Sequence, residues 1–522
     1  MSFFTWTAFA GIAIVWLFSV QIARVYRLRR FYEKQGIKFV KECYAIIGAE
    51  LCVMKLIKNN KSHDWLYLDA ERETRANLIG TIRGFSIQLY GTNAEVCQKL
   101  LHQDGKFVDR DTPSLYSFGR LCPKAIPFIP LSQDLFVLRK ASLTRALDLS
   151  MNRLFRIAQQ KSDEIMARFD VENGSGTVID ISDLLRRWTG ETSGEFIWGS
   201  NVNRMVEVYD EQNVLVCIQF MTALHQTFSS LRFYGNNFWN RVCPPVARLP
   251  ATRENRRLSY NVRVLREAVK GMMATPDESS VAQIVQKRND EIGVALEMTT
   301  DDLIAATVAG LDTVISSTMA TLWNVLQPQN VRWRQKVTAE VTTAFANPET
   351  IHLALARGEV LNAVIYESMR LEPPGSLMNN TATADFDLSI GGKSYHIKSG
   401  TRIVTSIHAL HQNDVSWRSA LKANFVPLDV FDPTRFIDHS TLLVGSSCFM
   451  PFGKGSRRCP GRGIGLFMIK VFIASFLLRN AKCFVTVPKG QTKEMTHFNL
   501  FSRATYYIHC ASDEQDDMGP AC

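Results

Sequence analysis

Paired cysteines of the kind that bind zinc or carry out thioredoxin-type redox chemistry are missing from this sequence. The 522 residues include 11 cysteines, and no two of them are spaced as Cys-x-x-Cys. Their number is odd and their spacing is irregular, which disfavours a disulfide framework and favours reduced thiols in a reducing compartment. The chain also lacks internal repeats and low-complexity tracts.

Charged side chains are absent from residues 1–23, and the stretch Phe3–Ile22 is mostly apolar. As a helix its twenty residues would rise about 30 Å, the thickness of a bilayer core. A secretory signal peptide carries its positive charge before the apolar run. Here a basic cluster follows the run, at Arg24, Arg27, Arg29 and Arg30. The positive-inside rule therefore predicts a membrane anchor with its N-terminus outside or in the lumen and the rest of the chain in the cytosol. A buried core helix is the alternative, but it would usually carry more of a polar face.

Beyond this stretch no apolar run reaches 18 residues, so we predict a single membrane span. Long helical patterns fill the middle of the chain. Short alternating stretches typical of strands cluster at residues 84–90, 386–407 and after 482. The pattern predicts a mainly α fold with small β-sheets. The formal net charge of +10 favours an anionic partner such as membrane lipid, nucleic acid or an acidic protein, and a solvated basic surface is the plain alternative.

The most specific motif is the ten-residue segment Phe452–Gly461, with the sequence FGKGSRRCPG. Glycines at positions 453, 455 and 461 would let the backbone turn tightly and approach a flat ligand closely. Cys459 stands just before a predicted helix and is flanked by arginines at 457, 458 and 462. We therefore expect a depressed pKa for Cys459. Its thiolate would be a soft ligand suited to iron, and such a ligand donates electron density that favours O–O cleavage.

Three other interpretations of this segment are open. Cys459 could be a buried structural cysteine, because free cysteine often packs as a small hydrophobe. The glycines could mark a phosphate loop, but they lack both the Walker spacing and the third-glycine spacing of the dinucleotide fingerprint. Cys448 could be the metal ligand instead, but it lacks flanking glycines and arginines.

The segment satisfies every fixed position of F-x-x-G-x-R-x-C-x-G, and the chain thereby resembles the cytochrome P450 family of haem-thiolate enzymes. This resemblance implies that Cys459 is the axial ligand to the iron of haem b and that Arg457 pairs with a haem propionate. It also assigns cofactor-binding positions to Phe452, Gly455 and Gly461.

Glu367 and Arg370 form a Glu-x-x-Arg pair on a helix predicted at 359–371 and stopped by prolines. Taken alone, such a pair is usually a surface salt bridge worth under about 1 kcal/mol. The resemblance implies instead a buried network in which Arg435 is the third member. Thr434 stands where the family often has glutamate.

A helix is predicted over residues 300–326, with capping-box spacing between Thr299 and Asp302 at its start. Within it, Ala309 and Thr313 share one face. A glycine at 310 costs about 1 kcal/mol relative to alanine, which a packing contact could offset. The resemblance implies a groove for dioxygen at Ala309 and Gly310, and it makes Asp312 and Thr313 the acid–alcohol pair that relays protons to the bound oxygen.

Arg139, in the segment LFVLRKASL, resembles the family's propionate-binding arginine. The tryptophan often found four residues before that arginine is Leu135 here. His408 and His411 follow the strand predicted at 401–407, and the resemblance implies a structural role for both.

The resemblance covers nearly the whole chain and implies a cytochrome P450 fold preceded by one transmembrane helix. We expect an anchor at 1–23, a basic linker at 24–45, a catalytic domain at 46–512 and an acidic tail at 513–522. The expected location is the endoplasmic reticulum membrane, with the catalytic domain facing the cytosol.

The implied activity is a monooxygenase that uses O2 and electrons from an NADPH-dependent flavoprotein reductase. Lys454, Arg458 and Arg462 could dock that reductase, and no nucleic-acid partner is expected. The chain resembles fungal enzymes that tailor terpenoids, polyketides or alkaloids, so a lipophilic small molecule is the expected substrate. Its contacts would come from Thr112–Phe118, Phe220–Trp239, the helix at 300–326, the strand after Pro374 and Phe498–Phe501. A haem-thiolate isomerase or dehydratase that needs no reductase, and a non-enzymatic haem sensor or carrier, are the alternatives.

Overall fold

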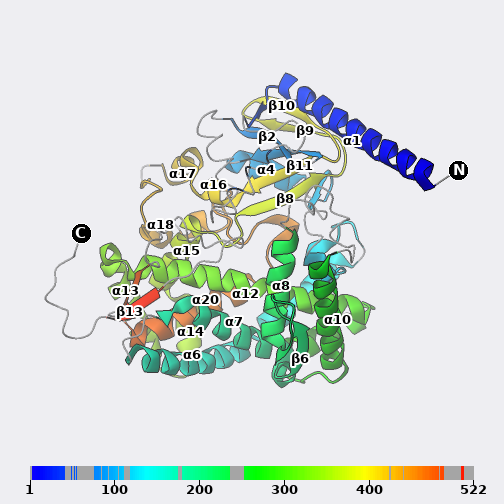
Figure 1. Ribbon diagram of the computed structural model, residues 1–522. Coiled ribbons are helices and arrows are strands. Elements are labelled where there is room, and N and C mark those ends of the chain that lie inside the picture. Colours follow the sequence, from blue (N-terminus) through cyan, green and yellow to red (C-terminus); the bar gives the residue numbers. More distant parts are fainter. Residues whose placement is uncertain are drawn as a thin grey trace.

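Helices make up most of the molecule, and the largest sheet lies at one end of it (Figure 1). This computed structural model confirms the mainly α architecture that the sequence predicts. It describes residues 3–40, 49, 52, 55, 76–83, 85–91, 93–103, 105–110, 118–133, 135–174, 179–235, 252–422, 425–438, 440–480, 483–486 and 507–510, some of them by backbone only. The predicted acidic tail and the predicted substrate contacts at 236–239 and 498–501 lie outside these residues, as do 112–117.

The largest sheet has six strands in the order β1-β2-β3-β11-β8-β4. The strands are β1 Lys38–Phe39, β2 Leu78–Arg83, β3 Ser86–Gly91, β11 Arg402–Ser406, β8 Leu377–Ala382 and β4 Val108–Arg110. β11 lies parallel to β3 and antiparallel to β8, so the sheet joins segments about 300 residues apart. A hairpin of β9 Phe386–Ile390 and β10 Lys393–Ile397 packs on the same core. The strands predicted within 84–90 and 386–407 are therefore present.

Two smaller sheets complete the β structure of the described residues. One is a hairpin of β6 Met205–Tyr209 and β7 Leu215–Gln219, and the other contains β12 Cys483–Thr486, β13 Tyr507–Cys510 and β5 Ile179–Asp180. Cys483 is disulfide-bonded, and the register sets it opposite Cys510 in the neighbouring strand. The prediction that the cysteines are reduced is therefore wrong for Cys483. Six other described cysteines are free.

The helical part surrounds the long helix α12. Its main helices are α5 Phe136–Leu149, α6 Met151–Gly174, α7 Ile181–Trp198, α8 Phe220–Gly235, α10 Arg253–Ala274, α11 Val281–Glu291, α12 Leu296–Leu326, α13 Val331–Phe345, α14 Ile351–Arg357, α15 Glu359–Leu371 and α20 Arg462–Arg479. Shorter helices are α4 Ala94–His102, α16 Ile407–His411, α17 Asp414–Leu421, α18 Thr434–Asp438 and α19 Ser440–Leu443. The helices predicted at 300–326 and 359–371 correspond to α12 and α15.

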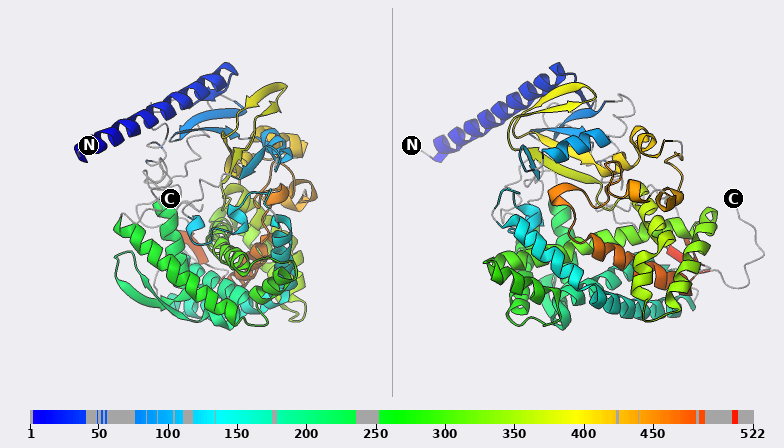
Figure 2. Two further views of the ribbon diagram at one scale, coloured as in Figure 1. Left: turned by 90° about the vertical axis from the view of Figure 1, so that its right-hand side faces the viewer. Right: turned by 180° about the vertical axis from the view of Figure 1, so that it is seen from behind.

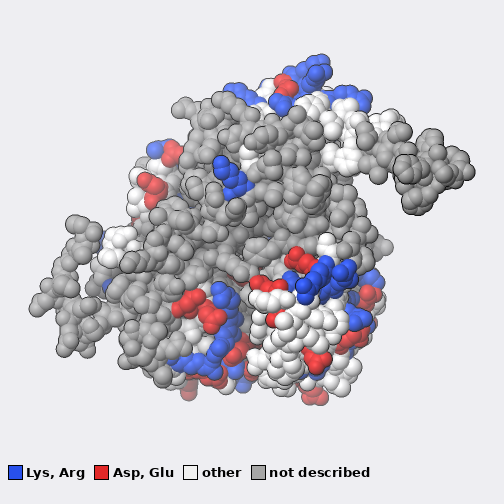
Figure 3. All heavy atoms as spheres, in the orientation of Figure 1, with Lys and Arg blue, Asp and Glu red and all other residues white. Residues whose placement is uncertain are grey.

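At its N-terminus the chain forms one continuous helix, α1 Phe3–Lys34, which lies along the sheet end of the molecule and extends beyond it (Figures 1 and 2). Its second half packs into the sheet core, where the hydroxyl of Tyr32 lies 2.7 Å from Thr401 Oγ1. Trp16, by contrast, is 64% exposed. The start of the predicted linker at Arg24 thus falls inside this helix. Basic side chains gather where α1 meets the sheet end (Figure 3).

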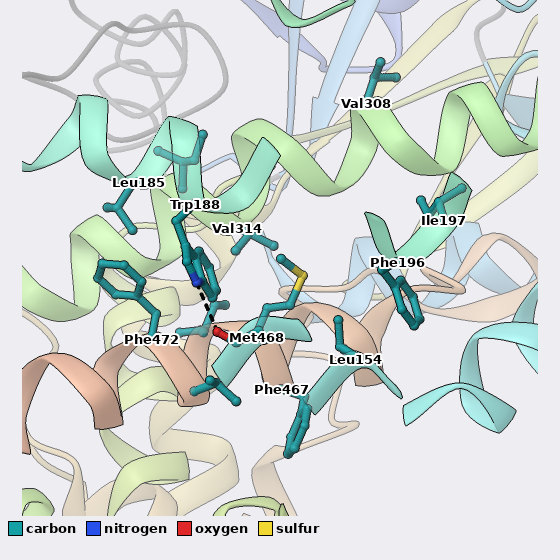
Figure 4. Close-up of a cluster of buried hydrophobic side chains, with 14 of the residues drawn as sticks. Leu154, Leu185, Trp188, Phe196, Ile197, Val308, Val314, Phe467, Met468 and Phe472 are labelled. Atoms are coloured by element: carbon teal, nitrogen blue, oxygen red, sulfur yellow. Dashed lines mark hydrogen bonds between the residues drawn. The ribbon is translucent and has the colours of Figure 1, made fainter. Parts of the chain in front are cut away.

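The core lies where α6, α7, α12 and α20 meet, as Figure 4 shows. The ring of Trp188 on α7 packs edge-on against Phe472 on α20, with ring centroids 4.9 Å apart, and its Nε1 donates to Ala158 O on α6. Both α12 and α20 are buried along most of their length, as expected of helices at the centre of a large domain. By length and composition α12 could also cross a membrane, but its apolar window is 67% buried within the protein.

Candidate functional site

The loop that carries Cys459 joins α19 to α20 and is folded back on itself. The N–H of Cys459 donates to the carbonyl oxygen of Phe452 at 3.0 Å. Gly453 and Gly455 have φ of +66° and +73°, in the left-handed region that favours glycine. Gly461, the residue before α20, has an ordinary φ of −89°. The backbone conformation therefore requires glycine at two of the three glycine positions of the segment Phe452–Gly461, and the chain reaches Cys459 just before the N-terminus of α20.

The side chain of Cys459 is exposed, whereas Cys448 is buried beside Ser446. Cys459 is therefore the thiol of this region that a cofactor could reach. Desolvation by the surrounding protein raises its pKa, while the N–H of Gly461 and the charges of Lys140, Arg110 and Arg458 act in the opposite direction. The predicted depressed pKa of this thiol is therefore wrong for the protein by itself, because the loss of hydration outweighs the nearby cations.

Arg457 is expected from the sequence to lower the pKa of Cys459, but its guanidinium pairs with a carboxylate instead. Its Nη2 lies 2.6 Å from Oδ1 of Asp109 on β4, and it also donates to Ile129 O at 2.7 Å. Its guanidinium stacks over the ring of Phe136, 4.9 Å from the centroid. Arg462, another of the expected cations, lies over the ring of Phe452 at 5.9 Å. The sequence gives no signal for Asp109, which is 348 residues away along the chain.

Arg139 points into the protein and forms a buried ion pair with Asp302. Its Nε and Nη2 donate to the two carboxylate oxygens, each at 2.9 Å, and both side chains are almost fully buried. Burial raises the pKa of Asp302 to about 6, against the opposing effect of the guanidinium. The third nitrogen, Nη1, is buried and has no hydrogen-bond partner among the described residues. A buried, unsatisfied guanidinium N–H fits an anionic group such as a propionate.

The predicted capping box at the start of α12 is wrong. The helix begins at Leu296, so Thr299 and Asp302 both lie inside it. Thr299 Oγ1 accepts a hydrogen bond from Asn289 Nδ2 at 2.8 Å, and Asp302 accepts the N–H of Ile126 as well as Arg139. Tertiary partners therefore take the side chains that the local spacing would assign to a cap.

The middle of α12 carries the predicted acid–alcohol pair. Ala309 is exposed although most of this helix is buried. Thr313 Oγ1 donates to Ala309 O at 2.7 Å, and Oδ1 of Asp312 lies 2.9 Å from Nε2 of His225 on α8. A methyl group added at Gly310 would lie 3.8 Å from Ser193 Oγ, an ordinary contact distance. Close packing therefore does not require a glycine there, and His225 is a neighbour that the sequence does not reveal.

The structure brings Glu367, Arg370 and Arg435 together in a fully buried cluster. Arg370 donates to both oxygens of Glu367, at 2.8 and 2.9 Å, and Arg435 Nε lies 3.3 Å from Oε1 of the same carboxylate. Arg435 also donates to the carbonyl oxygens of Val426 and Pro427. Thr434, which stands where the family often has glutamate, donates a hydrogen bond from its hydroxyl to Asp432. The three charges are thus satisfied by one another and by backbone carbonyls, as buried charges require.

These residues form a consistent set for a haem. Cys459 offers one exposed, soft thiol ligand, Arg139 has a free buried N–H for an anion, and Ala309 leaves an accessible stretch on the central helix. The guanidinium of Arg457 donates its hydrogen bonds to the carboxylate of Asp109 and to the carbonyl oxygens of Ile126 and Ile129. A propionate would have to share it with that carboxylate.

Comparison with known proteins agrees with this arrangement. The family model described as Cytochrome P450 matches residues 82–509. The chain is 25% identical over 382 residues to dolabradiene monooxygenase of Zea mays, covering 72% of each protein. It is 22% identical over 458 residues to cytochrome P450 6d3 of Musca domestica, covering 81% of this chain and 84% of that one. Indolin-2-one monooxygenase of Zea mays is 25% identical over 403 residues, with 72% of this chain and 70% of the relative covered. The chain therefore belongs to the cytochrome P450 family and is a monooxygenase that depends on haem, O2 and electrons from a redox partner.

Proposed function

We propose that Cys459 is the axial ligand of a haem b and that the enzyme inserts oxygen into a lipophilic small molecule. The observation that carries this proposal is the exposed thiol of Cys459 in a loop held by its own hydrogen bond to Phe452 and by two left-handed glycines. When bound, the haem supplies the iron at which O2 is activated, and the thiolate ligand supports O–O cleavage.

The other site residues orient the cofactor and move protons. Arg139 binds a propionate through Nη1 while Asp302 holds its other two nitrogens. Asp312 and Thr313 deliver protons from the middle of α12, where each already makes a hydrogen bond of 2.9 Å or less. The buried cluster around Glu367 fixes α15 behind the loop and takes no part in proton transfer.

Electrons come from NADPH through a membrane-bound flavoprotein reductase. Arg458 beside the cysteine is exposed, and Arg462 and Lys454 are half-buried near it, which gives an acidic partner a cationic surface to dock on. Exposed apolar side chains on α1, which include Trp16, Leu17, Phe18 and Val20, together with the basic residues that follow, support a single-span anchor in the endoplasmic reticulum membrane.

The proposed substrate class rests on the names of similar proteins. Dolabradiene monooxygenase and indolin-2-one monooxygenase are named for small organic molecules, and 11-oxo-beta-amyrin 30-oxidase of Glycyrrhiza uralensis is another similar protein. A secondary metabolite such as a terpenoid, polyketide or alkaloid is the proposed substrate. Comparison of the extractable metabolites of a deletion strain with those of its parent would identify the molecule.

The decisive experiment is the spectrum of the reduced carbonyl complex, followed by turnover with an added reductase. The wild-type complex should absorb at the red-shifted position of a thiolate haem, and Cys459→Ser should abolish that band while Cys448→Ser keeps it. A thiolate spectrum that survives in Cys459→Ser contradicts the proposal. Turnover that needs no NADPH, O2 or reductase would instead indicate an isomerase or dehydratase, and absence of any turnover would favour a carrier.

A further inference from the structure

His411, at the end of α16, is fully buried and hydrogen-bonded through both ring nitrogens. Its Nε2 accepts the backbone N–H of Met450 at 3.0 Å, and its Nδ1 lies 3.3 Å from the carbonyl oxygen of Met369. A backbone N–H can only donate, so Nε2 carries no proton, and Nδ1–H donates to Met369 O. The ring is therefore a neutral imidazole in a single tautomer.

The two hydrogen-bond partners of this imidazole belong to two different parts of the candidate site, helix α15 and the loop that carries Cys459. Met369 precedes Arg370, which holds Glu367, and Arg370 Nη1 also donates to the carbonyl oxygen of His411 at 3.4 Å. On the other side, Met450 lies in the loop between α19 and α20, two residues before the signature segment Phe452–Gly461. Its carbonyl oxygen accepts the N–H of Gly453, three residues along the loop, at 3.0 Å. His411 thus joins the arginine network of α15 to the loop that carries Cys459.

From Met450 the connection to the thiol is short. Two residues further along, Phe452 accepts the N–H of Cys459. Displacement of Met450 would therefore move the carbonyl oxygen that anchors Cys459. An apolar side chain of similar size could fill the space of the ring, but it would leave the buried N–H of Met450 without a partner.

The surroundings of the ring keep it neutral. Desolvation lowers the pKa of His411 to about 3, and electrostatic interactions with Arg370 on α15 and with His408 on α16 act in the same direction. On the loop side the imidazole packs at a tilt against the ring of Phe449, with centroids 4.9 Å apart, and this neighbour is uncharged. The acceptor at Nε2 is thus preserved at physiological pH.

We propose that His411 is a positioning residue that fixes the cysteine loop at Met450, just before the signature segment, by accepting the N–H of Met450, and that it thereby sets the position of the thiolate on the iron. The proposal rests on the proposed role of Cys459. It adds a residue outside the signature segment to the set that controls the iron–sulfur bond, and its action is exerted through the backbone.

The test compares His411→Phe, which keeps a ring but removes both bonds, with His411→Gln, whose amide oxygen can accept the N–H of Met450. His408→Phe on the same helix is the matched control. Each full-length protein is loaded with haem and converted to the reduced carbonyl complex. The loss of the thiolate band on mild warming is then measured, and the reduction potential is measured separately. The Phe variant should lose the band about fivefold faster than wild type, and the Gln variant should recover much of the difference.

A second measurement does not depend on the haem. Hydrogen exchange of the Met450 amide in the haem-free chain should be slow in wild type and in the Gln variant, and faster in the Phe variant if that variant folds. A wild-type Met450 amide that exchanges as fast as a solvent-exposed one overturns the proposal. So does a folded Phe variant whose band loss and reduction potential match wild type and the His408 control. If wild type itself lacks the thiolate band, the role of Cys459 fails first, and with it the effect of His411 on the iron, although the exchange result would still stand.

Discussion

His225 on α8 and Asp312 on α12 are joined by a hydrogen bond of 2.9 Å between Nε2 and Oδ1. The two side chains are 24% and 15% exposed, so the contact lies at the edge of the helical core. It orients the carboxylate one residue before Thr313, whose own hydroxyl bonds Ala309 O. The acid and the alcohol of the proposed proton relay are thus each held by a separate partner.

Removal of this imidazole should disturb proton delivery without removing the acid. In His225→Ala, Asp312 loses the bond that orients it, so a larger share of the electrons should form peroxide or water instead of product. His225→Gln, which can still donate to the carboxylate, should retain most of the coupling. Product formed per NADPH consumed is the quantity to measure, and equal coupling in all three proteins would contradict the role of His225.

Thr313 should matter through its hydroxyl and not through its shape. Thr313→Ala removes the group that donates to Ala309 O at 2.7 Å and should lower product formation about tenfold while NADPH consumption continues. Thr313→Ser keeps the hydroxyl and should stay near wild type, whereas Thr313→Val keeps the shape and should resemble the alanine variant. If the valine variant is as well coupled as wild type, the hydroxyl is not part of the relay.

The parts of the site that the sequence predicts are those with local, specific spacing. Cys459 stands in a ten-residue signature, and Glu367 and Arg370 are one helical turn apart. By contrast, Asp109 meets Arg457 across 348 residues, and His225 meets Asp312 across 87. Such pairs arise only from tertiary packing, which no spacing in one sequence records.

Two errors of the sequence analysis have the same physical origin. Thr299 and Asp302 have capping-box spacing, but Asn289 and Arg139 are better partners once the helices pack. The arginines near Cys459 suggest a low pKa for its thiol, but desolvation by the surrounding protein has the larger effect, and the extent of that desolvation depends on the folded structure. Local signals are reliable where tertiary contacts agree with them, and they fail where burial supplies a stronger interaction.

The buried ion pair of Arg139 and Asp302 should contribute far more to the free energy of unfolding than the half-exposed pair of Lys124 and Glu297. Asp302→Asn leaves a buried guanidinium without its carboxylate, which should reduce the free energy of unfolding by about 3–5 kcal/mol and weaken haem retention. The control is Glu297→Gln, which removes the partner of Lys124 from a pair about half exposed on the same helix, at 48% and 52%. That variant should unfold like wild type. Chemical denaturation with haem content measured in parallel would check both, and equal stability of the two variants would contradict the assignment.

Protonation of His411 should make the protein less stable in mild acid. An unfolded histidine titrates near pH 6.5, whereas burial lowers the pKa of His411 to about 3 in the folded chain. Between these values the unfolded chain binds a proton that the folded chain excludes, so the stability present above pH 6.5 is lost as the pH falls. Wild type should therefore lose up to about 1.4 kcal/mol of unfolding free energy per pH unit more than His411→Gln between about pH 6 and 4. The comparison with the variant removes the contribution of Asp302, whose raised pKa acts in the opposite direction over part of this range. Denaturation midpoints of the two detergent-solubilised proteins at several pH values would measure the difference, and parallel pH profiles would show that His411 is not buried in its neutral form.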